Sequence, residues 1–156
     1  MSHEHHYTAT VTWTGNQGTG TSGYTAYSRN HTISIEGKPD ISGSSDAAFR
    51  GDKSRYSPED SFVAAISACH MLWYLHLCAV NNVVVEKYVD QSSAVMTENE
   101  NGSGQFRQII LKPIVTVQKS EMADKAMSLH TQTHDMCFLA RSVNFEIRHE
   151  PVILTQ

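Results

Sequence analysis

The sequence has too few cysteines, too little positive charge and no apolar run long enough for several large classes of protein. Three cysteines among 156 residues are too few for a secreted scaffold held together by disulfides. Lys and Arg number 12 against 16 Asp and Glu, so the net charge is −4 and nucleic acid has no basic surface to bind. No uninterrupted apolar run reaches the ~18 residues of a membrane span, and the N-terminal stretch lacks the apolar region of a signal peptide. We therefore expect a cytoplasmic protein that binds neither nucleic acid nor membrane.

What is present is the composition of a globular protein, with 40% hydrophobic and 18% charged residues. Its length suits a single domain over residues 1–156. Strand and helix periodicities alternate in an α+β order. The expected strands are 7–13, 24–28, 32–36, 83–96, 105–117, 144–148 and 152–154, and the expected helices are 57–80 and 121–133. Residues 37–56 form a long irregular segment, which is often functional in a compact domain.

The first helix has a strong start signal. Ser57 is a capping residue, Pro58 suits the first helical position, and Glu59 and Asp60 favour the positive end of the helix dipole. Ser57 with Asp60 also resembles a capping box. We expect this helix to bury a stripe at helical spacing, which consists of Phe62, Ala65, Ile66, Cys69, Leu72, Trp73, His76 and Leu77.

The chemistry of the residues leaves three roles open for the cysteines. Free cysteine usually packs in the core, as we expect for Cys78. A zinc site is a second role, because the chain offers soft and borderline ligands at Cys69, His70, His130, His134 and Cys137. The third role is a hydrolase nucleophile at Cys69, which needs a distant histidine as base because His70 points about 100° away on a helix.

A fourth role comes from two motifs. Ser57-Pro-Glu59 is followed ten residues after the Glu by Ala-Cys69, and a second cysteine lies in His-Asp-Met-Cys137-Phe-Leu-Ala-Arg. Together they resemble the OsmC/Ohr family (osmotically inducible protein C and organic hydroperoxide resistance protein), over nearly the whole chain. The resemblance implies an OsmC-like fold, with antiparallel sheets around a central cysteine-bearing helix, and an intertwined homodimer. It also implies a thiol-dependent peroxidase that needs no metal or other cofactor.

The resemblance assigns roles to the two cysteines. Cys69 corresponds to the peroxidatic thiol, which attacks the peroxide and becomes a sulfenic acid. Cys137 corresponds to the resolving thiol, which condenses with it to a disulfide. An external dithiol, of which a lipoyl group is one example, then reduces that disulfide. If Cys137 lies on a helical turn that begins at Asp135, the helix N-terminus would favour its thiolate.

The resemblance also implies an arginine that stabilises the thiolate and a glutamate that orients this arginine. The glutamate corresponds to Glu59. Arg50, in Ala-Phe-Arg-Gly-Asp, is the favoured arginine, with Arg29 and Arg55 as competitors. On a continuous helix Glu59 lies about 15 Å along the axis from Cys69, so it would serve the Cys69 of a second subunit.

The chain departs from the common family pattern at two positions. His70 stands where many members have Phe, and Phe138 stands where Pro is frequent. His70 is either a proton donor or a packed core residue, and Trp73 and Tyr74 either line an apolar pocket or belong to the core. Two further alternatives for the whole protein are a redox sensor and a small-molecule-binding stress protein on the same fold.

Overall fold

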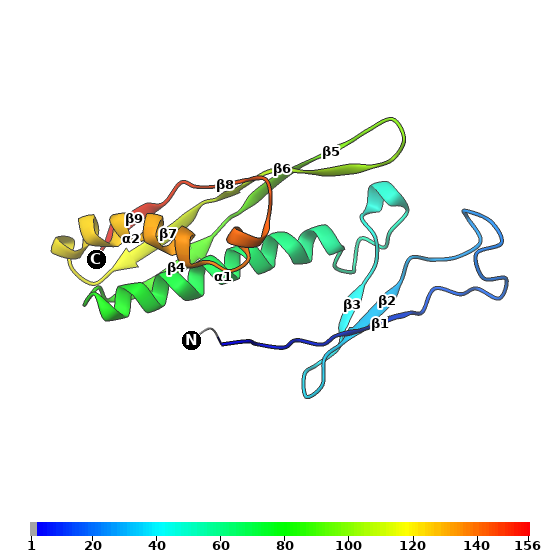
Figure 1. The fold of residues 1–156 in the computed structure, drawn as a ribbon, viewed down its shortest axis with the longest axis horizontal. Helices are drawn as coiled ribbons and strands as arrows, with labels where there is room; N and C mark the ends of the chain where they lie inside the picture. The colour runs from blue at the N-terminus through cyan, green and yellow to red at the C-terminus, as the bar shows by residue number, and fades with distance from the viewer. Residues whose placement is uncertain (1–2) are drawn as a thin grey trace. The chain divides into compact units, whose positions relative to one another are not determined.

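The computed structural model describes residues 3–156, which form two compact units (Figure 1). Unit 1 ends at Ser61 and unit 2 begins at Phe62. Both carry small β-sheets, and the long helix α1 (Pro58–Val80) begins in one unit and continues through the other. The α+β class is confirmed, whereas the single domain over residues 1–156 stays a prediction.

Unit 1 is built on a three-stranded antiparallel sheet. Its strands are β1 (Thr10–Trp13), β2 (His31–Ser34) and β3 (Ile41–Gly43), in the order β1-β2-β3. The strand expected at 24–28 is absent, because residues 19–26 make successive turns and only a single bridge joins Asn16 to Tyr27. The segment expected to be irregular, 37–56, contains β3 and the short 3-10 helix η1 (Ala47–Phe49).

The start of α1 confirms the predicted capping box. The Asp60 backbone N–H donates to Ser57 Oγ at 3.0 Å, and the Ser57 backbone N–H donates to Asp60 Oδ2 at 3.0 Å. Each side chain therefore satisfies a backbone donor that the first turn leaves free, which fixes where the helix begins.

Unit 2 splits the predicted long hairpin between two sheets. β4 (Val85–Asp90) pairs with β7 (Pro113–Val117), and β5 (Ser93–Glu98) pairs with β6 (Gly104–Leu111). The last strands, β8 (Glu146–His149) and β9 (Val152–Thr155), add in parallel to β6 and β7 respectively. The expectation of antiparallel sheets holds for unit 1 and fails for unit 2, where both sheets are mixed.

Asp90 lies at the corner where the hairpin passes from one sheet to the other. Its carboxylate accepts hydrogen bonds from the Ser67 hydroxyl of α1 at 2.5 Å and from the Ser92 hydroxyl at 2.7 Å. It also accepts the backbone N–H of Lys112, between β6 and β7, at 2.7 Å. One side chain thus ties both strands of the hairpin to α1.

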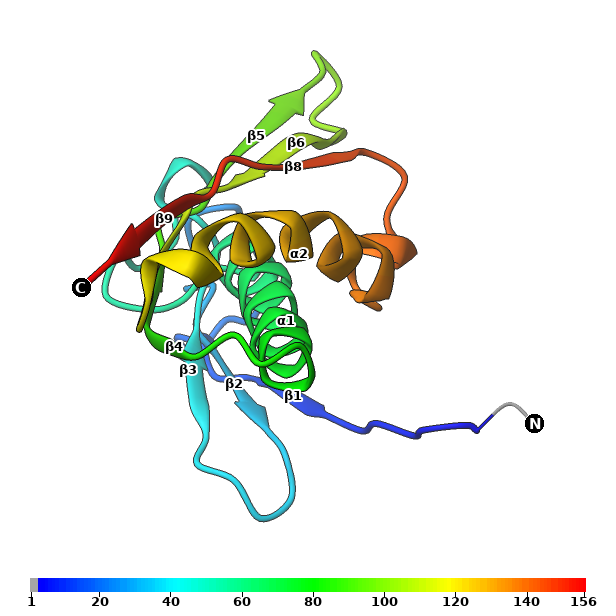
Figure 2. The ribbon, with the colours of Figure 1, turned by 90° about the vertical axis from the view of Figure 1, so that its left-hand side faces the viewer.

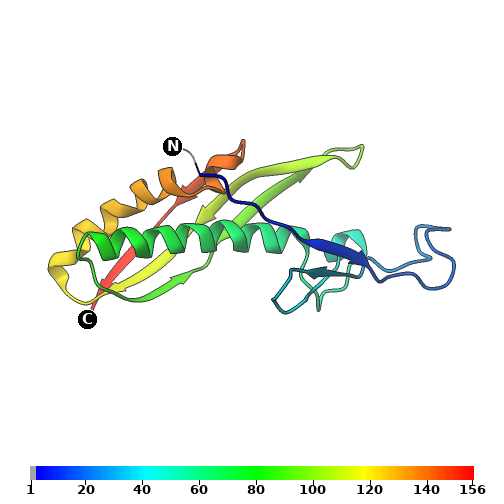
Figure 3. The ribbon, with the colours of Figure 1, turned by 60° about the horizontal axis from the view of Figure 1, so that its bottom comes forward.

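Two apolar clusters hold unit 2 together, with α1 and α2 (Ala123–Met136) lying next to each other against the strands (Figures 2 and 3). Between α1 and α2 the core includes Tyr74, Leu77 and Leu129, packed on Val115 and Val117 of β7. Ile66 of α1 packs instead on β6 and β8 in the second cluster. The short 3-10 helices η2 (Ser120–Met122) and η3 (Ala140–Ser142) flank α2.

The buried face of α1 differs from the predicted stripe. The buried side chains on this helix are Ile66, His70, Tyr74, Leu77 and Cys78. Ala65, Leu72 and His76, which were expected inside, are exposed. The prediction failed because α1 is apolar nearly all round, so that spacing alone does not select one face.

By length and composition α1 would also suffice to cross a membrane, contrary to the expectation that no stretch does. This is weak evidence for a membrane span, since the core helix of a soluble protein meets the same two criteria. Only 28% of its most apolar 18-residue window is buried within the chain. Much of the apolar surface of α1 is therefore exposed in the part of the chain that the structure describes.

Candidate active site

Unit 2 brings Cys69 and Cys137 into contact, although 68 residues separate them in sequence. Cys69 lies in the middle of α1, and Cys137 is the residue that ends α2. Their Sγ atoms are 2.8 Å apart, and both cysteines are free thiols. A sulfenic acid on either sulfur would have the other thiol within reach, so this pair is placed to form a disulfide.

The two thiols differ in accessibility. Cys137 is fully buried, whereas Cys69 is partly exposed, so only Cys69 is open to a molecule from solution. Burial, followed by the hydrogen bond to Cys69, raises the pKa of Cys137 to about 11, although the Ala140 backbone N–H, 3.4 Å from the sulfur, opposes this shift. The favoured thiolate predicted for Cys137 is therefore wrong: its sulfur does accept the Ala140 N–H of the turn that follows, but the residue is buried at the C-terminal end of α2 and burial prevails.

The third cysteine, Cys78, is confirmed as a core residue. It is 1% exposed beside Tyr74, and burial raises the pKa of its thiol. A buried and protonated thiol is a poor nucleophile. Cys78 can therefore serve as an unreactive internal control when the reactivity of the other two thiols is measured.

An apolar hollow lies one helical turn beyond Cys69. It has a volume of ≈ 270 Å³ and is lined by Leu72, Trp73 and His76, with the Phe138 ring 5.6 Å edge-on from Trp73. Trp73 therefore lines a pocket, while Tyr74 is core and donates its hydroxyl to the Ala126 carbonyl at 3.1 Å. An organic group bound here would lie close to the exposed thiol.

Histidines form a separate cluster in unit 2. His70 of α1 and His130 of α2 are each 1% exposed, and His70 Nε2 lies 3.0 Å from His130 Nδ1. The ring of His149 is 6.0 Å from that of His70, and His134 is 6.2 Å from His149. His70 is thus a packed and hydrogen-bonded core residue.

The zinc alternative is wrong for residues 3–156, where no three of the His, Cys, Asp and Glu side chains converge on a common point. His70 and His130 point their facing nitrogens at each other, and their rings are nearly parallel at 4°. Ligands of one metal ion instead direct their nitrogens to a shared centre.

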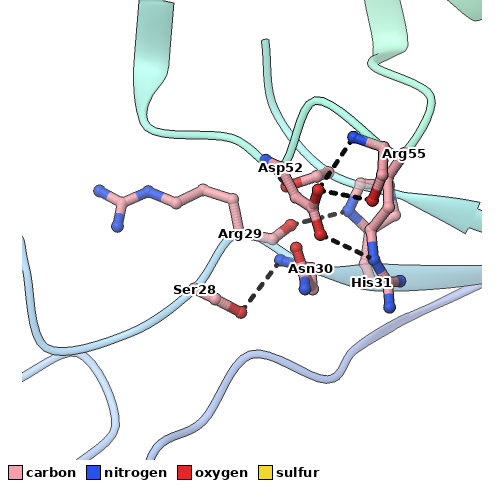
Figure 4. A network of polar contacts seen from close by, with 8 residues as sticks. Ser28, Arg29, Asn30, His31, Asp52 and Arg55 are labelled. Atoms are coloured by element: carbon pink, nitrogen blue, oxygen red, sulfur yellow. Dashed lines mark hydrogen bonds and ion pairs between the residues drawn. The ribbon is translucent and has the colours of Figure 1, made fainter. Parts of the chain in front are cut away.

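Unit 1 holds the three candidate arginines, and two of them are engaged. Figure 4 shows Arg55 beside Asp52, with Nε 3.6 Å from the carboxylate, and Arg29 pointing away from that pair. Arg29 donates to the Tyr27 carbonyl at 2.8 Å and lies over two tyrosine rings.

Arg50 is the least engaged of the three. Its guanidinium lies 5.7 Å from the Tyr24 ring, and it has neither a hydrogen bond nor an ion pair among residues 3–156. Its backbone is left-handed at φ 64, because Arg50 ends the short helix η1 and its N–H donates to the Ala47 carbonyl.

Glu59 keeps one carboxylate oxygen without a partner. Oε2 is buried and accepts no hydrogen bond from the residues that the structure describes. No ion pair within that part of the chain joins Glu59 to Arg50, Arg29 or Arg55. A buried carboxylate oxygen without a donor is costly, so Oε2 is open to a donor such as an arginine or an ordered water molecule.

Known proteins resemble the chain over its whole length. The family described as OsmC-like protein matches residues 51–151, and the chain belongs to this family. Among solved structures, an OsmC-like protein of unknown function from Vibrio cholerae is 28% identical, with a TM-score of 0.85 over 96% of this chain and 100% of that one. An organic hydroperoxide resistance protein from Elizabethkingia anophelis is 15% identical, with a TM-score of 0.69 over 100% of both chains. A comparison with curated proteins found no match.

Sequence reasoning missed the pairing of His70 with His130. A signal for it exists: His130 belongs to the buried stripe of α2, with Ala126, Leu129 and Thr133 at helical spacing. A histidine on such a stripe needs a polar partner, and His70, inside an apolar run, has the same need.

Proposed function

We propose that this protein is a thiol-dependent peroxidase that reduces organic hydroperoxides, with Cys69 as the peroxidatic and Cys137 as the resolving cysteine. The observation that carries the proposal is the 2.8 Å contact between these two sulfur atoms from separate helices. The difference in burial supports this division of roles, since of the two thiols only the partly exposed Cys69 is open to a peroxide. Some solved structures of this fold are named organic hydroperoxide resistance proteins, which supports the same chemistry.

Two balanced steps make up the reaction. The Cys69 thiolate attacks one peroxide oxygen, the O–O bond breaks, and the leaving alkoxide takes a proton to become an alcohol. Cys137 sulfur then attacks the sulfenic acid, water leaves, and the disulfide forms. A dithiol of the lipoyl or thioredoxin type returns two electrons and two protons and is itself oxidised to a disulfide.

We infer that Arg50 stabilises the Cys69 thiolate and that Glu59 orients this arginine. Arg50 is free to take this role, because its guanidinium is not committed to another group among the described residues. A guanidinium can bind a carboxylate through its planar fork while facing the sulfur. The unpartnered oxygen of Glu59 is the acceptor such an arginine would satisfy.

A second copy of the chain completes the site in this proposal. Glu59 and Cys69 are ten residues apart on the unbroken helix α1, which puts them about 15 Å apart along its axis. The exposed face of α1 is apolar, with Leu72 and Val80 each more than 60% exposed, as expected of a helix that packs on its copy. Two antiparallel copies would bring each Glu59 to the Cys69 of the other subunit.

Single turnover tests the proposal directly. The reduced protein receives one equivalent of cumene hydroperoxide, and free thiols and mass are followed with time. We expect the three free thiols to fall to one, with a peptide map that joins Cys69 to Cys137 and leaves Cys78 free. If all three thiols survive for minutes, the protein is not a peroxidase.

Repeated turnover then separates an enzyme from a sensor. With excess dithiothreitol, a peroxidase consumes many equivalents of cumene hydroperoxide. A sensor whose disulfide resists reduction consumes about one equivalent of peroxide and then no more than dithiothreitol alone.

A further inference from the structure

The two helices that carry the reactive cysteines are also joined by two buried histidines. Along α1, Cys69 contacts α2 through sulfur, and the next residue, His70, contacts α2 through its imidazole. On α2, His130 lies seven residues, about two turns, before Cys137. Two cross-helix contacts at successive residues of α1 fix how far one helix is shifted along the other and how it is rotated about its axis.

The histidine pair is held from several sides. The Tyr74 ring stacks on His130 with centroids 3.9 Å apart, and Tyr74 itself is anchored by its bond to the Ala126 carbonyl. His149 of β8 lies 6.2 Å from His130 and 6.0 Å from His70, measured between ring centroids. Neither imidazole can therefore turn away without disturbing packed neighbours.

The bond between the two imidazoles requires a particular proton arrangement. One of the facing nitrogens donates an N–H and the other accepts it, so the pair needs only one proton between the helices. His130 Nε2 is buried and has no partner among the described residues, so the bond to His70 is the only one that the imidazole of His130 makes within that part of the chain. Losing this bond would leave a buried imidazole without any partner, which is unfavourable.

We propose that His70 and His130 are positioning residues for the sulfur chemistry, because their hydrogen bond holds α1 and α2 in the register at which Cys69 and Cys137 meet. This inference rests on the redox pair of the proposed function. It assigns no contact with substrate to either histidine. It predicts that the pair governs how readily the disulfide closes, while the access of reagents to Cys69 is unaffected.

Equilibrium with glutathione measures the closing step without any peroxide. The full-length protein is equilibrated in mixtures of reduced and oxidised glutathione, and the Cys69–Cys137 disulfide is quantified by mass. The ratio of disulfide to dithiol protein at known glutathione concentrations gives the effective concentration of the Cys137 thiol around Cys69. Alkylation of Cys69 by iodoacetamide, measured in parallel, reports access to this thiol alone.

Three variants separate positioning from packing. H70L leaves His130 without its partner, H70L/H130L fills both places with apolar groups, and H70Q/H130N keeps nitrogen atoms near Nε2 and Nδ1. For H70L and H70L/H130L we expect the effective concentration to fall about tenfold, the size of one buried hydrogen bond. H70Q/H130N should restore the effective concentration to within about threefold of the wild-type value. Q132L, at an exposed polar residue of α2 that lies between His130 and Cys137 in sequence, is the matched control and should not change it.

The alkylation rate of Cys69 should stay near the wild-type value in all folded variants. The proposal is overturned if H70L/H130L closes its disulfide as readily as the wild type, since the pair would then only fill space. It is equally overturned if the effective concentration in H70Q/H130N is no higher than in H70L/H130L. Should H70L fail to fold, the two double variants alone decide. A wild-type disulfide that forms with glutathione but never with peroxide would refute the peroxidase proposal and leave this test intact.

Discussion

The two buried imidazoles make the stability of the protein sensitive to mild acid. Burial, followed by neighbouring imidazoles, lowers the pKa of His70 to about 4 and that of His130 to about 3, from an ordinary value of 6.5. Asp90 opposes the shift at His70, and His149 and His134 contribute to it. Both imidazoles are therefore neutral in the folded protein at pH 5, whereas in the unfolded chain they take up protons below pH 6.5.

Because the unfolded chain binds more protons, the free energy of unfolding falls as the pH falls below 6.5. Above pH 6.5 both imidazoles are neutral in the folded and the unfolded chain, so the free energy of unfolding keeps its full value there. From pH 6.5 to pH 5 each imidazole costs about 1.4 kcal/mol per pH unit, hence about 2 kcal/mol each and at most about 4 kcal/mol for the pair. This is a large share of the roughly 5–15 kcal/mol by which domains are stable.

Urea denaturation at pH 7, 6 and 5 measures the effect, with a reductant present and the protein concentration fixed, since association would add its own term. The H70Q/H130N variant is the comparison, because amides do not titrate. Wild type should lose up to about 4 kcal/mol more than this variant between pH 7 and pH 5. Equal losses in both proteins would show that burial does not lower the pKa values of the two histidines in the folded state.

Three further predictions concern the site and its second subunit. In C137S, one equivalent of cumene hydroperoxide should leave Cys69 as a sulfenic acid, seen by mass as one added oxygen atom and by dimedone trapping; an unmodified Cys69 would contradict its role. R50A should slow the reaction of Cys69 with peroxide about tenfold or more, while R55A, whose partner Asp52 is a surface carboxylate, should change it less than about twofold. L72D places a charge on the exposed apolar face of α1 and should convert a dimer to a monomer on gel filtration, with loss of peroxidase activity; an active monomer would refute the shared site.

Local signals in the sequence predicted the local parts of the fold. Ser57 and Asp60 form the expected capping box, because both partners lie within one turn. The hairpin between residues 83 and 117 was also recognised, since its strands are neighbours in sequence. By contrast, the parallel pairing of β8 with β6 joins distant segments, such as Ile147 with Ile109, and no local pattern specifies such a partner.

The site was predictable where a motif carried it. Cys69 and Cys137 were paired by resemblance, and the structure brings their sulfur atoms together. The histidines were read as a possible zinc set because spacing along one helix does not tell which way a nitrogen points. His70 and His130 are 60 residues apart, so only the packing of α1 on α2 makes them partners.

The carboxylate of Asp90 has a consequence for how the molecule opens. Its three donors come from α1, from the turn after β4 and from the crossing between β6 and β7, so these segments share a single acceptor. Displacement of Asp90 breaks all three bonds at once, so an opening that moves this carboxylate loosens the three segments together. The Lys112 amide, held at 2.7 Å, should then exchange its hydrogen with solvent at the rate at which α1 loosens from the hairpin. A single amide signal would report the motion of the helix that carries Cys69.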